Sequence, residues 1–185
     1  MYSAAILAGG KATRYGGRDK SALVVDGRTI LESQIAMLSP LTDDLMIIRA
    51  ADDVVPGCGP LGGLHAALTK MRGAAAFVIA CDMPFVTAPV VAYLVSLADC
   101  ADIVVPKTAR GYHPLCAVYT RGCLEPVAAR LAGRRLAMRD LVAAMRTRVV
   151  TAEEIDRFGD RYRLLANVNT PAEHAGLEAL QGHEL

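Results

Sequence analysis

The chain has 185 residues, of which 53% are hydrophobic and 21% are charged, and its net charge is +1. This composition predicts a globular protein with a sizeable core, formed by a single domain over residues 1–185. A near-neutral chain lacks the overall basic field that attracts nucleic acid, and 5% aromatic residues without tryptophan disfavour a base-stacking surface.

Five cysteines occur without a Cys-x-x-Cys pair, which predicts reduced thiols rather than a zinc site or a disulfide framework. A strand-like segment begins almost at the N-terminus, in place of a signal peptide. No apolar run approaches the length needed to cross a bilayer. We therefore expect a cytoplasmic protein that binds neither nucleic acid nor a membrane.

Apolar runs alternate with segments of helical periodicity from one end of the chain to the other. Strands are expected at 3–7, 45–48, 74–80, 102–106, 115–119 and 149–150, with 45–48 covered on both faces. Helices are expected at 29–38, 60–71, 88–97, 122–132, 138–145 and 170–180, and a polar loop at 107–113. This alternation predicts an α/β fold, with a mostly parallel sheet between two layers of helices, as in a Rossmann-like three-layer sandwich.

A glycine-rich, basic loop follows the first strand. Between positions 9 and 20, four glycines accompany Lys11, Arg14, Arg18 and Lys20. Exposed backbone N–H groups in such a loop form an anion-binding concavity, and Lys and Arg side chains add full positive charges. An ordinary βα turn is the alternative, but the basic residues favour a polyphosphate site. The loop lacks the spacing of a Walker A motif or a dinucleotide fingerprint.

Polar residues are expected at the same edge of the sheet as this loop. Asp82 closely follows the predicted strand 74–80, and Asn169 lies just past a further predicted strand at 164–168. In open α/β sheets, ligands lie beyond the carboxyl ends of the strands. Mg²⁺ prefers one or two carboxylates together with phosphate oxygens, which favours Asp82 as a metal ligand over a loop-capping role.

The roles of Asn167, Asn169 and His113 are each open to two interpretations. Asn167 or Asn169 supplies a neutral oxygen to the metal or bonds a ribose hydroxyl, although turn formation before Pro171 fits the spacing equally well. His113 either contacts a second substrate or has a structural role, and the structural role is the more common one for a single loop histidine.

These motifs resemble those of the molybdenum cofactor guanylyltransferases. The resemblance covers nearly the whole chain, and the first motif is shared with a wider superfamily that includes sugar-nucleotide enzymes. The matching residues are Leu7-Ala8-Gly9-Gly10, Arg14, Gly16-Gly17, Asp19-Lys20, Gly59-Pro60-Leu61-Gly62-Gly63, Cys81-Asp82-Met83-Pro84, His113-Pro114 and Asn167-Val168-Asn169-Thr170-Pro171.

The resemblance implies the fold of the nucleotide-diphospho-sugar transferases and the transfer of GMP from GTP to the phosphate of molybdopterin, with release of pyrophosphate. It implies Mg²⁺ as the cofactor, GTP and molybdopterin as substrates, and a recipient molybdoenzyme or its chaperone as a further partner. The acid that precedes the family's Gly-Pro-Leu motif corresponds to Asp52 or Asp53, and Arg49 stands near a position where relatives often have Asn. The implied catalytic residues are Arg14, Lys20 and Asp82, the implied nucleotide contacts are Leu7, Ala8, Gly9, Gly10, Lys20, Asp53 and Asp82, and the implied metal ligands are Asp82 and Asn169.

Two other functions are consistent with the same motifs. The first is cytidylyl transfer, or nucleotidyl transfer to another phosphorylated acceptor. Relatives that use CTP tend to carry Leu-Ala-Ala-Gly, so Gly9 favours guanine. The second is a non-catalytic nucleotide-binding partner of a molybdoenzyme, which the presence of Asp82 and Lys20 argues against.

Overall fold

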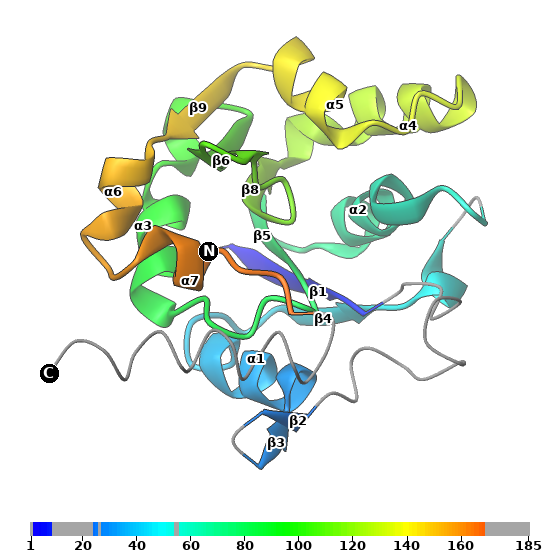
Figure 1. Cartoon of the computed structure of the whole chain (residues 1–185). Helices are drawn as coiled ribbons and strands as arrows, with labels where there is room; N and C mark the ends of the chain where they lie inside the picture. Colours follow the sequence, from blue (N-terminus) through cyan, green and yellow to red (C-terminus); the bar gives the residue numbers. More distant parts are fainter. Residues whose placement is uncertain (1, 9–23, 26, 54–55, 169–185) are drawn as a thin grey trace, which may run out of the picture.

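The computed structural model describes residues 2–8, 24–25, 27–53 and 56–168 (Figure 1). Its central sheet has the strand order β4-β1-β5-β8-β6-β7, and β9 pairs with β6. The strands are β1 Ser3–Leu7, β4 Leu45–Ile48, β5 Ala75–Ala80, β6 Ile103–Thr108, β7 Gly111–Tyr112, β8 Cys116–Thr120 and β9 Thr147–Val150, and a separate pair is formed by β2 Val24–Val25 and β3 Arg28–Thr29.

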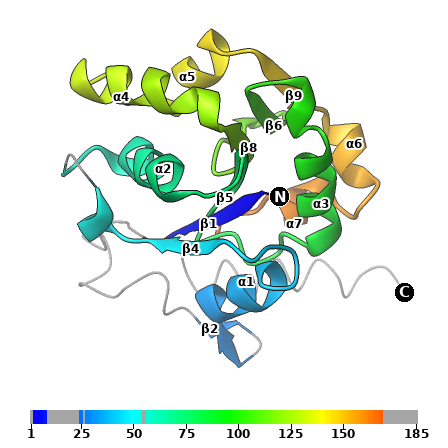
Figure 2. The same ribbon diagram turned by 180° about the vertical axis from the view of Figure 1, so that it is seen from behind.

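Helices cover the sheet on both faces, which confirms the predicted three layers (Figures 1 and 2). One face is covered by α2, α4 and α5, and the other by α1, α3, α6 and α7. The helices are α1 Ile30–Leu38, α2 Gly59–Lys70, α3 Ala88–Ser96, α4 Leu124–Ala132, α5 Met138–Ala144, α6 Ala152–Asp156 and α7 Arg161–Leu164, with 3-10 turns η2 Ala50–Asp52, η3 Ala98–Cys100 and η4 Arg121–Cys123.

The two faces of the sheet carry separate halves of the core because successive side chains of a strand point in opposite directions. In β5, Phe77 and Ile79 pack with α1, α3, α6 and α7, whereas Ala76 and Val78 pack with α2, α4 and α5. All of these side chains are fully buried, so a continuous apolar run is the pattern that a central strand requires.

The sheet is mostly parallel, as predicted, but it contains two reversed strands. β1 runs parallel to β4 and β5, and β6 runs parallel to β9. β8 lies antiparallel between β5 and β6, and β7 is antiparallel to β6. The chain from β6 to β8 is too short for a crossover helix, so the following strand has to reverse its direction.

Several sequence-based expectations were wrong. The predicted polar loop at 107–113 is a hairpin, because β6 continues to Thr108 and pairs with β7. The strand β4 is not covered on both faces, because it lies at the sheet edge and Ile47 is 37% exposed. Residues 165–168 form no strand, and the short helices α6 and α7 were not predicted. The expected helix at 170–180 lies outside the described residues.

All five cysteines lie within the described residues and are free. Among the same residues, none of the helices has both the length and the apolar character that crossing a bilayer requires. A cytoplasmic location stays a prediction.

Candidate nucleotidyl-transfer site

The candidate site lies where β1 and β5 end side by side. The backbone N–H of Cys81 donates to the carbonyl of Leu7 at 3.2 Å, and the N–H of Ala8 donates to Ile48 at 2.8 Å. The start of the predicted phosphate loop therefore lies next to the residue that precedes Asp82. Gly9, Gly10, Arg14 and Lys20 lie outside the described residues, so their roles stay predictions.

The Asp82 side chain is joined to the last described segment of the chain. Asn167 Nδ2 donates to Asp82 Oδ1 at 2.9 Å, and the Val168 N–H donates to the Asp82 carbonyl at 2.7 Å. The structure thus brings together two of the predicted motifs, which are 85 residues apart in the sequence. The amide that contacts Asp82 belongs to Asn167, whereas Asn169 lies outside the described residues.

Gln34 supports the turn that presents Asp82, and it was missed by the sequence analysis. It is 2% exposed, and its Nε2 donates to the carbonyls of Ala80 at 2.9 Å and Met83 at 3.1 Å. One signal was available in the sequence. Gln34 lies four residues from both Ile30 and Leu38, so a polar residue occupies the stripe of α1 that faces the core.

The Gly-Pro-Leu-Gly-Gly motif forms the first turns of α2. Its last two glycines, Gly62 and Gly63, have no side chains and so leave space for neighbouring side chains. A Cβ at Gly62 would lie 3.0 Å from the carboxylate of Asp53, and a Cβ at Gly63 would lie 3.4 Å from the side chain of Leu7. The motif therefore lets the helix approach both the end of β1 and Asp53. This packing is a physical reason for glycine at both positions.

Asp52 and Asp53, which the sequence analysis left as alternatives, have different environments. Asp52 forms an ion pair with Lys70 and accepts a hydrogen bond from the N–H of Arg49 at 2.7 Å. Partial burial, followed by the nearby charge of Asp52, raises the pKa of Asp53 above its ordinary value. Asp52 is thus engaged in local structure, while the Asp53 carboxylate lies against the start of α2.

His113 precedes β8, which lies on the other side of β5 from β1. The Ala80 N–H donates to the Leu115 carbonyl at 2.9 Å, and the Cys116 N–H donates to the His113 carbonyl at 3.0 Å. The turn before β8 is thereby fixed beside the end of β5. His113 Nε2 lies 2.9 Å from Thr108 Oγ1, and burial, followed by the charge of Arg110, lowers its pKa.

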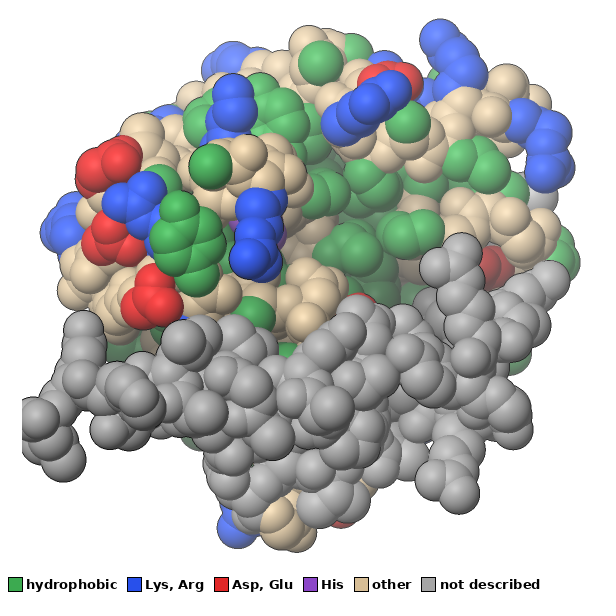
Figure 3. Space-filling view, viewed as in Figure 1, with side chains coloured by type: hydrophobic (Ala, Val, Ile, Leu, Met, Phe, Trp, Pro, Cys, Tyr) green, Lys and Arg blue, Asp and Glu red, His purple; other side chains and the backbone are tan. Residues whose placement is uncertain are grey.

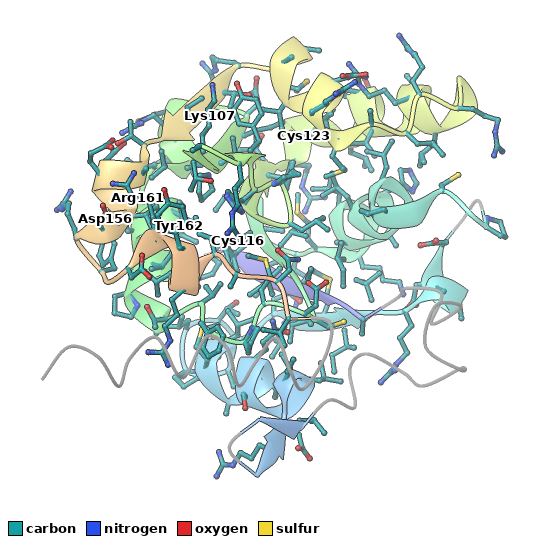
Figure 4. The ribbon with its side chains drawn as sticks, viewed as in Figure 1. Lys107, Cys116, Cys123, Asp156, Arg161 and Tyr162 are labelled. Atoms are coloured by element: carbon teal, nitrogen blue, oxygen red, sulfur yellow. The ribbon has the colours of Figure 1, made fainter. Side chains whose placement is uncertain are left out.

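The surface beside these residues is hollowed. Figure 3 shows a depression lined mainly by hydrophobic side chains, with a basic side chain and a histidine at its margin. Figure 4, in the same orientation, shows Tyr162 on α7. A concave surface with few polar groups at its edge is the usual form of a small-molecule site.

The comparisons with known proteins agree with this geometry. Residues 4–149 match the family model described as the MobA-like NTP transferase domain. The chain belongs to this family.

Two relatives and one solved structure illustrate the similarity. A molybdenum cofactor guanylyltransferase from Desulfosudis oleivorans is 31% identical over 94% of this chain and 93% of its own length. A probable molybdenum cofactor guanylyltransferase from Clostridium perfringens is 36% identical over 66% of this chain and 68% of its own length. The crystal structure of molybdopterin-guanine dinucleotide biosynthesis protein A from Archaeoglobus fulgidus covers 98% of this chain and 99% of its own, with 22% identity and a TM-score of 0.82, which shows the same fold.

A divalent metal is typical of nucleotidyltransferases, and the residues at this edge fit one. Asp82 supplies carboxylate oxygens and is only partly buried, and the Asn167 amide contacts it directly. The described residues contain no group of three or more His, Cys, Asp or Glu side chains arranged for a metal. Such a donor set suits Mg²⁺, which keeps waters and substrate phosphates as ligands, better than a metal that requires an all-protein cage.

Proposed function

We propose that this protein is a molybdenum cofactor guanylyltransferase, which transfers GMP from GTP to the phosphate of Mo-molybdopterin and releases pyrophosphate. The observation that carries the proposal is the position of Asp82. It lies at the carboxyl end of β5, beside the residue where the phosphate loop is expected to begin, in a chain of this family. The 31% identity to a guanylyltransferase over 94% of the chain favours guanine as the base.

The proposed roles follow from the chemistry of the side chains. Lys20, Arg14 and the backbone amides of residues 7–10 would hold the phosphates of GTP, with Lys20 as a point charge and Arg14 as a planar fork. Asp53, whose carboxylate lies against the first turn of α2, would contact the nucleotide. Asp82 would hold Mg²⁺, with Asn169 or Asn167 supplying an amide oxygen.

The reaction needs alignment more than acid–base catalysis. An oxygen of the acceptor phosphate, already ionised near neutral pH, forms a bond to the α-phosphorus of GTP, and pyrophosphate leaves with the bonding electron pair of the broken P–O bond. The loop residues would fix the α-phosphate in line with the acceptor and stabilise the charge that develops in the transition state. Mg²⁺, when bound, supplies positive charge to the α-phosphate and the leaving pyrophosphate.

The direct test is a pyrophosphate-release assay with purified protein, Mg²⁺ and molybdopterin, with GTP and CTP supplied separately. We expect release with GTP and only weak release with CTP. Faster release with CTP would identify a cytidylyltransferase. Binding of GTP, seen as a rise in melting temperature, without any release would favour the non-catalytic nucleotide-binding partner.

A further inference from the structure

The β6–β7 hairpin holds an arginine in a defined position beside the candidate site. Thr108 pairs with Gly111, so Ala109 and Arg110 form the two-residue turn between the strands. Gly111 has a φ of 106°, a conformation that glycine adopts readily. The Arg110 N–H donates to Thr108 Oγ1 at 3.2 Å, and this hydroxyl also lies 2.9 Å from His113 Nε2.

The Arg110 side chain contacts an aromatic ring, that of Tyr162, and forms no ion pair with a carboxylate of the described residues. Its guanidinium lies over the ring of Tyr162, 5.7 Å from the ring centre, and Tyr162 is itself 49% exposed. A cation over an aromatic face is attracted by the ring while its charge remains available to an anion. Burial, followed by the positive charge of Arg110, lowers the pKa of the His113 imidazole.

The charge of Arg110 is not neutralised by the described residues. None of their carboxylates lies within 4.0 Å of its guanidinium, the distance that defines an ion pair. Five other arginines in the described ranges have such partners, namely Arg72, Arg139, Arg146, Arg148 and Arg161, whereas the rest, like Arg110, have none. The charge of Arg110 is therefore open to an anion, and its position on the hairpin beside the site is what distinguishes it.

The sheet order assigns this cation to one side of the site. In the chain, the predicted phosphate loop comes after β1 and Asp82 comes after β5. The hairpin that carries Arg110 comes after β6, which lies two strands beyond β5 in the sheet. Strands are spaced by about 4.8 Å, so β1 and β6 lie roughly 14 Å apart. Asp82 stands between them. An anion bound at Arg110 is thus across Asp82 from the expected triphosphate.

We propose that Arg110 binds the phosphate monoester of the acceptor substrate, with Tyr162 holding its guanidinium and His113 beside it. This inference rests on the proposed function, and it adds an acceptor-binding residue to it. A guanidinium matches two phosphate oxygens at once, which orients the acceptor as well as attracting it. Arg110 thereby determines where the attacking oxygen lies relative to the α-phosphorus.

The test measures steady-state transfer by Arg110→Ala and Arg110→Lys with molybdopterin and GTP varied in turn. We expect Arg110→Ala to raise the KM for molybdopterin roughly tenfold or more, as the loss of a charge-assisted contact implies, with the KM for GTP unchanged. Arg110→Lys keeps the positive charge but lacks the planar guanidinium. Its KM for molybdopterin should therefore lie between the values of the wild type and of Arg110→Ala. Unchanged melting temperatures show that the variants are folded.

Lys107→Ala is the matched control. Lys107 lies on the same hairpin, with its Nζ 5.1 Å from the centre of the Tyr112 ring. Lys107 is exposed and its neighbour Thr108 is buried, so the two side chains lie on opposite faces of β6. Its removal changes the charge of the hairpin equally but should leave the KM for molybdopterin unchanged.

Four results would overturn the inference. An equal rise in KM for Lys107→Ala would mean that only the overall charge matters, and a rise in the KM for GTP would place Arg110 on the nucleotide side. An unchanged KM for molybdopterin in Arg110→Ala would overturn the inference while leaving the proposed function intact. Absence of transfer by the wild-type protein would overturn both.

Discussion

The two ends of the central sheet differ in how completely their buried polar atoms are hydrogen-bonded. At the amino end, Asp44 accepts hydrogen bonds from Ser3 Oγ at 2.5 Å and from the Arg72 N–H at 2.8 Å, and it pairs with the Arg72 side chain. Ser3 Oγ also accepts from the Gly73 N–H at 2.9 Å. At the carboxyl end, by contrast, Gln34 Oε1 accepts no hydrogen bond from the described residues.

Two aspartates show the same contrast in their pKa values. Burial acts to raise the pKa of Asp44, but hydrogen bonds from Ser3 and Arg72 outweigh it and hold this pKa below its ordinary value. Burial and the charge of Asp52 raise the pKa of Asp53. The fold thus stabilises the charged form of Asp44 and disfavours that of Asp53, whereas Asp52, beside Asp53, has its pKa lowered by hydrogen bonds from Lys70 and Arg49. Asp44 therefore serves stability, and Asp53 keeps a carboxylate that the fold itself does not stabilise.

Replacing Asp82 gives the largest expected effect on activity. Asp82→Ala should reduce transfer a hundred- to a thousandfold, the range seen when one group that stabilises transition-state charge is removed. The free energy of unfolding should fall by no more than about 1 kcal/mol, because the Asp82 side chain is partly exposed and its hydrogen bond with Asn167 lies at the surface. Pyrophosphate release and urea denaturation measure the two quantities. Transfer near the wild-type rate in the presence of Mg²⁺ would refute the role of Asp82.

Replacing Asp44 should give the opposite result. Asp44→Asn leaves the Arg72 N–H and Ser3 hydroxyl with a poorer acceptor, so we expect a loss of about 2–3 kcal/mol in the free energy of unfolding. Transfer by the folded variant should stay near wild type. A stable variant with impaired transfer would mean that the two ends of the sheet are not separate in function.

The same substitution has a defined pH dependence. Because the folded-state pKa of Asp44 is below its ordinary value of 3.8, its stabilisation is present above that pH and is lost as the pH falls through the folded-state pKa. The stability difference between wild type and Asp44→Asn should therefore shrink as the pH is lowered below about 4. Urea denaturation at several pH values from neutral downward measures this difference, and a constant gap would contradict the assignment.

Gln34→Leu tests how firmly the Asp82 turn must be held. The substitution keeps the side-chain volume but removes both donors to the Ala80 and Met83 carbonyls, so we expect a loss of about 1–2 kcal/mol. Transfer should fall severalfold at a temperature where the variant is folded, because the turn that presents Asp82 is less constrained. Ser39→Ala, an exposed change at the end of the same helix, is the control. Equal transfer by both variants would mean that Gln34 serves stability alone.

The smallest expected effect comes from Asp53. Its folded-state pKa is raised, so near neutral pH its charge opposes folding, and Asp53→Asn should raise the melting temperature by about 1–2 °C without nucleotide. If Asp53 contacts the nucleotide, adding GTP should raise the melting temperature of Asp53→Asn by less than it raises that of the wild type. A lower melting temperature without nucleotide would show that the Asp53 charge stabilises the start of α2.

The sequence determined the layers of this fold because local patterns encode them. Continuous apolar runs predicted β1 and β5, because a strand that is buried on both faces needs apolar residues at every position. Helical periodicity predicted α1 and α3, because a helix that buries one stripe repeats its apolar residues every three to four positions. The motif around Asp82 was equally visible, because a carboxylate directly after a buried strand needs a partner.

Only the tertiary structure decided which polar groups meet. The contact between Asp82 and Asn167, the support from Gln34 and the stacking of Arg110 on Tyr162 join residues that no local pattern relates. Strand order and direction set these contacts, because they determine which loops share an edge of the sheet. The reversed strand β8 places the β6–β7 hairpin at the same edge as Asp82, and this arrangement depends on long-range pairing rather than on periodicity.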